Sequence, residues 1–181
     1  VGCGGGHFVK SCQNAGLNCD GIEISDDSIN FAKEVFELDL IHGDLNSTKI
    51  EKKYDLITLW GIIEHVENPV QLIKSCKKYL TNQGMIVVTS PNLNSLSSHI
   101  QTDLKYNIIK SMCKMLLDND LTPKFAWYFG MDGYETIVQT NTALNKNKPI
   151  SPTEELKALS SSIQQFIDKH RVSDSFAFAC V

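Results

Sequence analysis

Glycine at alternate positions near the start of the chain is the feature that most constrains its fold. The first six residues read Val-Gly-Cys-Gly-Gly-Gly, with glycine at positions 2, 4 and 6, after a pattern typical of a strand end. Glycine has no Cβ atom, so it adopts positive φ angles and lets other groups approach the main chain. A strand, such a turn and then a helix hold a nucleotide-like cofactor in open α/β sheets. The sequence therefore predicts a cofactor-binding loop formed by Gly2, Cys3, Gly4 and Gly6.

The spacing of these glycines separates two kinds of cofactor loop. A dinucleotide fingerprint needs G-x-G-x-x-G, and counted from Gly2 its last glycine would fall on His7. The chain has G-x-G-x-G instead, which disfavours an NAD-type oxidoreductase or epimerase on a similar sheet but leaves it as an alternative. Glycine-rich turns are common, so the assignment needs support from the rest of the chain.

Composition and charge exclude several classes of protein. The 181 residues are 42% hydrophobic and 21% charged, which suits one compact domain with a real core. The net charge is −4 and Arg171 is the only arginine, which argues against a nucleic-acid-binding surface. No apolar run reaches membrane-spanning length. The six cysteines form no CxxC pair and no zinc-spaced cluster, so we expect reduced cysteines, no metal and a cytoplasmic location.

Strand-like and helical segments alternate along the first half of the chain. The patterns predict strands at residues 19–24, 40–42, 54–60 and 85–89, helices at 8–15, 28–36 and 68–80, and a turn at 82–84. This alternation predicts βαβ units, hence an α/β, Rossmann-like, doubly wound and mostly parallel sheet. Farther along, we expect helices at 96–119, 134–144 and 153–170 and strands at 124–130 and 176–181.

Two acidic residues follow predicted strands, where a nucleoside would bind. Glu23 ends the second strand about twenty residues after the glycine turn, and its carboxylate could accept both ribose hydroxyls. The alternative is a solvated glutamate at a strand end. Asp44 follows the third strand and could contact an adenine amino group, or could be an ordinary turn aspartate.

Six features occur in one order: the glycine turn, Glu23, Asp44, the apolar strand ending at Trp60, the helix opening at residues 63–66 and the turn at 82–84. This order resembles the class I S-adenosylmethionine (SAM) methyltransferases. It is most similar to the branch with the ubiquinone-biosynthesis O-methyltransferases and many polysaccharide-cluster methyltransferases. The resemblance is good over residues 1–92 and looser beyond. It implies one domain, 1–181, with a cofactor-binding half (1–92) and a substrate-side half (93–181).

The resemblance also implies roles for individual residues. The glycine loop would approach the methionine part of SAM, and Glu23 would hold the ribose. Ile24, Asp44 and Leu45 would frame the adenine, and Trp60 and Gly61 would line the methyl-transfer cleft.

The chain departs from this family in three respects. The family's acidic residue and strand before the first glycine lie outside the numbering, so we expect an N-terminally incomplete domain. Some members bind a metal through Glu-x-x-Glu-His, whereas this chain has Gly61 at the first position, so no metal is expected. The last strand should run antiparallel, and about forty residues (131–175) form a helical insertion before it in place of a short hairpin.

His65 is the candidate catalytic residue. Methyl transfer to a hydroxyl requires positioning of the nucleophile and removal of its proton, and a histidine at the cleft mouth suits that task. The alternative is that His65 caps or packs the following helix. No Asn/Asp-Pro-Pro-aromatic signature of base N-methylation follows the strand at 54–60, which favours an oxygen acceptor.

These observations predict a SAM-dependent methyltransferase that acts on a small-molecule or saccharide acceptor. The expected acceptor group is a hydroxyl, and a homodimer is the candidate assembly. The alternatives are the NAD-type enzyme and a non-catalytic SAM-binding protein. The aromatic residues at 125–134 are expected to pack as core and edge strand, with a ring-stacking platform beside the cleft as the looser interpretation.

Overall fold

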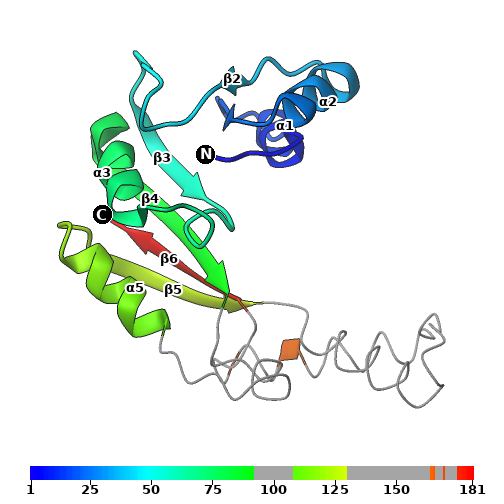
Figure 1. Ribbon diagram of the computed structural model, residues 1–181. Coiled ribbons are helices and arrows are strands. Elements are labelled where there is room, and N and C mark those ends of the chain that lie inside the picture. Colours follow the sequence, from blue (N-terminus) through cyan, green and yellow to red (C-terminus); the bar gives the residue numbers. More distant parts are fainter. Residues whose placement is uncertain (92–107, 130–163, 166–168, 170–174) are drawn as a thin grey trace.

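The computed structural model describes residues 1–91, 108–129, 164–165, 169 and 175–181 (Figure 1). Its helices are α1 (His7–Asn14), α2 (Asp26–Phe36), α3 (Pro69–Tyr79) and α5 (Ile108–Leu117). Its strands are β1 (Ile22–Glu23), β2 (Ile41–His42), β3 (Tyr54–Leu59), β4 (Leu80–Pro91), β5 (Pro123–Phe129) and β6 (Ser175–Cys180).

The strands form two ladders that residues 1–3 join. β1 pairs with β2 in parallel, and the second ladder has the order β3-β4-β6-β5. Between them, the nitrogen of Val1 donates to the carbonyl of Thr58 (3.0 Å), and the nitrogen of Gly2 donates to the carbonyl of Ile22 (2.8 Å). The order across the molecule is therefore β2, β1, residues 1–3, β3, β4, β6, β5.

Strand directions agree with the predicted fold class. β3 and β4 are parallel, whereas β6 runs antiparallel to both β4 and β5. The strand order reverses between residues 1–3 and β3, and crevices for ligands form at the carboxyl ends of strands on either side of such a reversal. The prediction of a Rossmann-like, mostly parallel sheet with an antiparallel last strand is confirmed.

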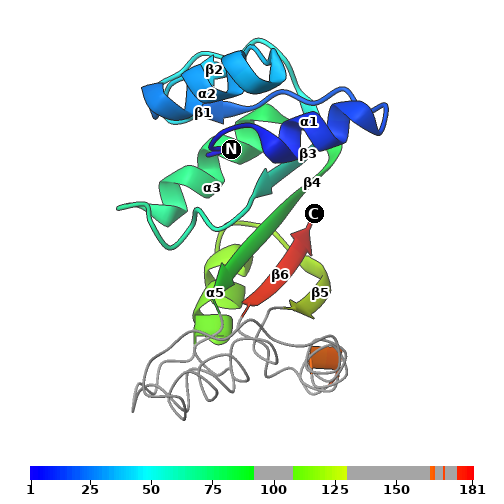
Figure 2. The same ribbon diagram turned by 90° about the vertical axis from the view of Figure 1, so that its right-hand side faces the viewer.

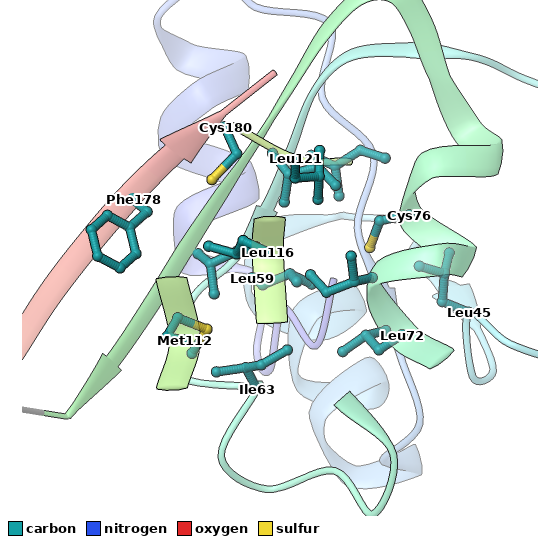
Figure 3. Close-up of a cluster of buried hydrophobic side chains, with 14 of the residues drawn as sticks. Leu45, Leu59, Ile63, Leu72, Cys76, Met112, Leu116, Leu121, Phe178 and Cys180 are labelled. Atoms are coloured by element: carbon teal, nitrogen blue, oxygen red, sulfur yellow. The ribbon is translucent and has the colours of Figure 1, made fainter. Parts of the chain in front are cut away.

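Helices lie on both faces of the sheet. Figures 1 and 2 show α3 and α5 on one side of the β3-β4-β6-β5 ladder, with α1 and α2 beside the β1-β2 end. The main hydrophobic core lies between that ladder and α3 and α5 (Figure 3). It includes Ile57, Leu59, Leu72, Ile73, Cys76, Ile86, Val88, Met112, Leu116, Phe178 and Cys180. Alternate residues of β3 and β4 enter this core, as the two-residue period of a strand requires.

Local capping explains where two helices begin. The hydroxyl of Ser25 accepts the N–H of Ser28 (3.3 Å) and caps the start of α2. The side chain of Asn68 accepts the N–H of Gln71 (3.0 Å), and Pro69 occupies the first turn of α3, where its missing N–H costs nothing. Within the described residues, no helix is long and apolar enough to cross a membrane.

Two local predictions were wrong, and one strand is shorter than expected. The turn expected at residues 82–84 lies inside β4, because Gly84 packs against the side chain of Leu80 and β4 takes up the extra residues as a register shift opposite β3. Residues 63–66 precede α3 as a turn, since Asn68 and Pro69 set the helix start. The strand expected at 19–24 is paired only at Ile22–Glu23.

The second half of the chain is described in part. The strands expected at 124–130 and 176–181 correspond to β5 and β6, and the helix expected at 96–119 is described from residue 108 as α5. The predicted helix at 134–144 and most of the insertion at 131–175 lie outside the described residues. Residues 164, 165 and 169, within the helix predicted at 153–170, are helical.

Candidate functional site

The glycine loop adopts the backbone that its sequence predicts. Gly2, Gly4 and Gly6 have φ angles of 60°, 52° and 78°, a region that side-chain-bearing residues rarely occupy. The N–H of Gly6 donates to the carbonyl of Cys3 (3.1 Å), which closes the turn, and α1 starts directly after Gly6. A Cβ atom at Gly4 would meet nothing within 4 Å, so its backbone borders open space. The loop therefore exposes main chain at the carboxyl edge of the sheet.

Glu23 is bound to the glycine loop by its side chain. It is buried, with 8% of its surface exposed, at the end of β1. Its Oε2 accepts the N–H of Gly4 (2.7 Å), and its Oε1 accepts those of Ile24 (2.9 Å) and Ser25 (3.0 Å). A carboxylate offers about four lone-pair positions. Oε1 already accepts two donors, and Oε2 can accept one more. The carboxylate can therefore bind one ribose hydroxyl, not one hydroxyl on each oxygen.

The hydrogen bonds also set the ionisation of Glu23. Burial raises its pKa, but the backbone N–H groups of Ser25, Gly4 and Ile24 outweigh burial and hold the pKa below its usual value. The group is therefore a carboxylate at neutral pH, with the negative charge facing the glycine loop.

The other predicted adenine contacts differ in exposure. The side chain of Ile24 is 68% exposed beside Glu23. Asp44 holds its own turn, because its Oδ1 accepts the N–H of Asn46 (2.8 Å). Leu45 is 5% exposed and packs in the main core, so its side chain offers little surface to a ligand. The hydroxyl of Ser75 on α3 donates to the Asn46 side chain (2.8 Å) and fixes this turn against the helix.

A second loop, residues 60–68 between β3 and α3, meets the glycine loop. Trp60 is 54% exposed, and its ring stacks on that of Phe8 with centroids 6.0 Å apart. Gly61 has a φ of 65°, and the side chain of Ile62 occupies the space that a Cβ at Gly2 would need. The structure thus brings Gly2, Trp60 and Gly61 together at the strand-order reversal.

His65, the predicted base, is exposed in the turn of the 60–68 loop. Its backbone N–H donates to the carbonyl of Ile62 (2.9 Å). Glu64 is also exposed, and its carboxylate lies over Gly61, 3.8 Å from where a Cβ would be. Both residues follow the carboxyl end of β3. The role of His65 as the base for the acceptor hydroxyl stays a prediction.

Two contributors to this site were missed in the sequence. Ile62 packs against Gly2, and Thr89 at the end of β4 accepts the N–H of Gly61 through its hydroxyl (2.8 Å). A polar residue at the carboxyl end of an apolar parallel strand was the available signal for Thr89. Nothing in the sequence indicated the contact of Ile62.

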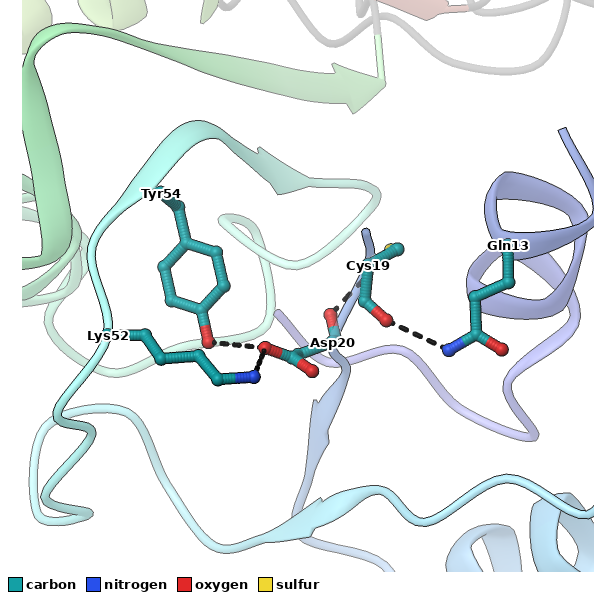
Figure 4. A network of polar contacts seen from close by, with 5 residues as sticks. All are labelled: Gln13, Cys19, Asp20, Lys52 and Tyr54. Carbon is teal, nitrogen blue, oxygen red and sulfur yellow. Dashed lines mark hydrogen bonds and ion pairs between the residues drawn. The ribbon is translucent and has the colours of Figure 1, made fainter. Parts of the chain in front are cut away.

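A cavity of about 500 Å³ opens at the other end of the strands. It lies between residues 19–22 and 54–58, toward the amino ends of β1 and β3, and α1 borders it with Phe8 and Cys12. Figure 4 shows the polar group at its rim. The carboxylate of Asp20 accepts hydrogen bonds from the ammonium of Lys52 (2.9 Å) and from the hydroxyl of Tyr54 (3.0 Å).

The charges of Asp20 and Lys52 at that rim are paired with each other. The hydrogen bond from Lys52 lowers the pKa of Asp20, and burial together with Asp20 raises the pKa of Tyr54 to about 12. The residues that line this cavity do not include those of the glycine loop, Gly2, Cys3, Gly4 and Gly6. Among the described residues, no group of three or more His, Cys, Asp or Glu side chains could hold a metal ion.

Comparison with known proteins agrees with this geometry. The methyltransferase domain family matches residues 1–132, which is more than half of the chain. The ubiquinone biosynthesis O-methyltransferase of Actinobacillus pleuropneumoniae serotype 7 is 31% identical over 103 residues, covering 51% of this chain and 44% of that protein. The mitochondrial ubiquinone biosynthesis O-methyltransferase of Schizosaccharomyces pombe is 24% identical over 118 residues, covering 61% and 43%. The chain thus spans less than half the length of these relatives.

Solved structures show the same fold. A SAM-dependent methyltransferase from Archaeoglobus fulgidus superposes with a TM-score of 0.64 at 20% identity, covering 99% of this chain and 82% of that one. An S-adenosylmethionine-dependent methyltransferase from Clostridium acetobutylicum gives a TM-score of 0.63 at 11% identity, with 99% and 80% covered. The family match decides against the NAD-type alternative. The chain belongs to the methyltransferase domain family, which confirms its resemblance to the class I SAM-dependent methyltransferases.

Proposed function

We propose that this protein transfers a methyl group from SAM to a hydroxyl of a small-molecule or saccharide acceptor. The observation that carries the proposal is the pairing of Gly4 with Glu23 beside the strand-order reversal. There, an exposed backbone turn and a buried carboxylate face one edge of the sheet. The names of the ubiquinone-biosynthesis relatives support an oxygen acceptor.

The residues fit the shape and chemistry of the adenosyl group. Open space above Gly4 admits a ligand against the main chain, which any side chain at that position would obstruct. The remaining lone pair on Oε2 of Glu23 suits one ribose hydroxyl. Ile24 offers an exposed apolar surface beside it, suited to an adenine ring. The turn of Asp44 and the backbone of Leu45 would border the adenine edge.

SAM supplies an electrophilic methyl group on a positively charged sulfur. In the transfer, the acceptor oxygen forms a bond to the methyl carbon while the carbon–sulfur bond breaks, giving S-adenosylhomocysteine and a methyl ether. The chain must orient the acceptor in line and take up its hydroxyl proton. Trp60 and Gly61 would line that cleft, and His65 would accept the proton.

Calorimetric titration of the protein with S-adenosylhomocysteine tests the cofactor assignment. We expect saturable binding, and no binding at millimolar ligand would contradict the proposal. A mass-spectrometric screen of hydroxylated acceptors with labelled SAM then tests turnover. Cofactor binding without methylation of any acceptor would favour the non-catalytic alternative. The homodimer and the cytoplasmic location stay predictions, which size-exclusion chromatography and cell fractionation can test.

A further inference from the structure

Thr89 carries a buried hydroxyl at the carboxyl end of β4. Only 4% of the residue is exposed, and its backbone pairs with Ala177 of β6, so the sheet fixes its position. Its Oγ1 accepts the N–H of Gly61 at 2.8 Å. This hydrogen bond joins β4 to the 60–68 loop, which otherwise leaves the sheet at the end of β3.

The bonded residue is the point at which that loop turns. Gly61 has a φ of 65°, in the left-handed region that favours glycine. Trp60 lies on one side of this turn, and on the other side Ile62 packs against Gly2 of the glycine loop. Fixing Gly61 therefore fixes the contact between the two loops of the proposed cofactor site.

We propose that Thr89 is a positioning residue for the methyl-transfer cleft, holding the Gly61 turn against the glycine loop through its hydroxyl. The inference rests on the proposed function, because it assigns Thr89 a role in SAM binding. Without the hydroxyl, the N–H of Gly61 would lack this acceptor and the turn would sample other positions. Cofactor binding would then have to order the loop, which would weaken the affinity.

Two substitutions separate the hydroxyl from the bulk of the side chain. Thr89→Val keeps the shape and the β-branched character of threonine but removes the acceptor, whereas Thr89→Ser keeps the acceptor and loses a methyl group. Thr81→Val is the matched control. Thr81 lies at the other end of β4 and donates to Asp55 (3.0 Å), far along the strand from Gly61.

The measurement is the Kd of S-adenosylhomocysteine by calorimetry, with the thermal midpoint of each variant recorded to confirm folding. Loss of one acceptor for a part-buried N–H corresponds to about a 10-fold weaker Kd for Thr89→Val. We expect Thr89→Ser to stay within about 3-fold and Thr81→Val to match the wild type, since neither removes the Gly61 bond. Amide hydrogen exchange on the wild-type protein should show Gly61 protected.

The possible results are distinct. Wild-type affinity in a folded Thr89→Val variant would overturn the inference, even though SAM binding itself stands. Equal weakening in Thr81→Val would also overturn it, because the effect would then follow β4 stability. If Thr89→Val does not fold, unprotected exchange at Gly61 in the wild type would refute the role. Absence of binding by the wild type would instead contradict the proposed function.

Discussion

Removing the carboxylate of Glu23 should loosen the glycine loop before any ligand is added. In the structure this buried group accepts three backbone N–H groups, at 2.7 Å from Gly4, 2.9 Å from Ile24 and 3.0 Å from Ser25. Hydrogen bonds to charged groups contribute about 1.5–3 kcal/mol each. Ile24 and Ser25 are exposed, so water can replace the carboxylate there, and the bond to Gly4 carries most of the effect.

We therefore expect Glu23→Ala to lower the free energy of unfolding by about 3 kcal/mol. For a domain of this size, that corresponds to a fall in Tm of about 6–12 °C. Urea denaturation followed by circular dichroism measures the change. Glu34→Ala, at an exposed position of α2, is the control and should change stability by less than about 0.5 kcal/mol. Equal stability of Glu23→Ala and wild type would refute the reasoning.

The pH dependence of this effect has a definite sign. The pKa of Glu23 is lowered in the folded protein, from a usual value of 4.5, so its ionisation stabilises the folded state above that pH. The advantage of wild type over Glu23→Gln should be constant near neutrality. It should shrink as the pH falls below 4.5 toward the lower folded-state pKa. An advantage that grows on acidification would contradict the assignment of the three hydrogen bonds.

Three further predictions concern single sites. Gly4→Ala forces a side chain into a φ of 52°, which should cost about 1–2 kcal/mol in urea denaturation and weaken S-adenosylhomocysteine binding; unchanged stability and binding would contradict this. Leu59→Ala opens a cavity in the core, where the residue is fully buried, and should lower stability by about 3 kcal/mol; a change below 1 kcal/mol would count against the core assignment. His65→Ala should lower the methylation rate by about 100-fold at unchanged cofactor affinity, and an unchanged rate would exclude His65 as the base.

Much of the fold can be predicted from the sequence. Alternate glycines predicted a loop with positive φ, and Gly2, Gly4 and Gly6 adopt it because no other residue type takes that backbone easily. Ser25 marks the start of α2, because its hydroxyl accepts an N–H that has no acceptor within the helix. The apolar run at 54–60 predicted β3, of which Ile57 and Leu59 are buried in the core. These signals are local, and each acts over a few residues.

The tertiary structure decided the contacts between residues that lie far apart in the sequence. The carboxylate of Glu23 binds Gly4 nineteen residues earlier, which makes it a support of the glycine loop as well as a candidate ribose ligand. Thr89 reaches Gly61, and Ile62 fills the space beside Gly2, because the order of strands sets these residues side by side. The residues at 82–84 carry turn chemistry but lie inside β4, where they form a register irregularity between the pairs Tyr54–Leu80 and Leu56–Met85. Sequence alone determined most of the helices and strands, because their signals are local. Packing decided which polar groups meet and where a local turn preference was overridden.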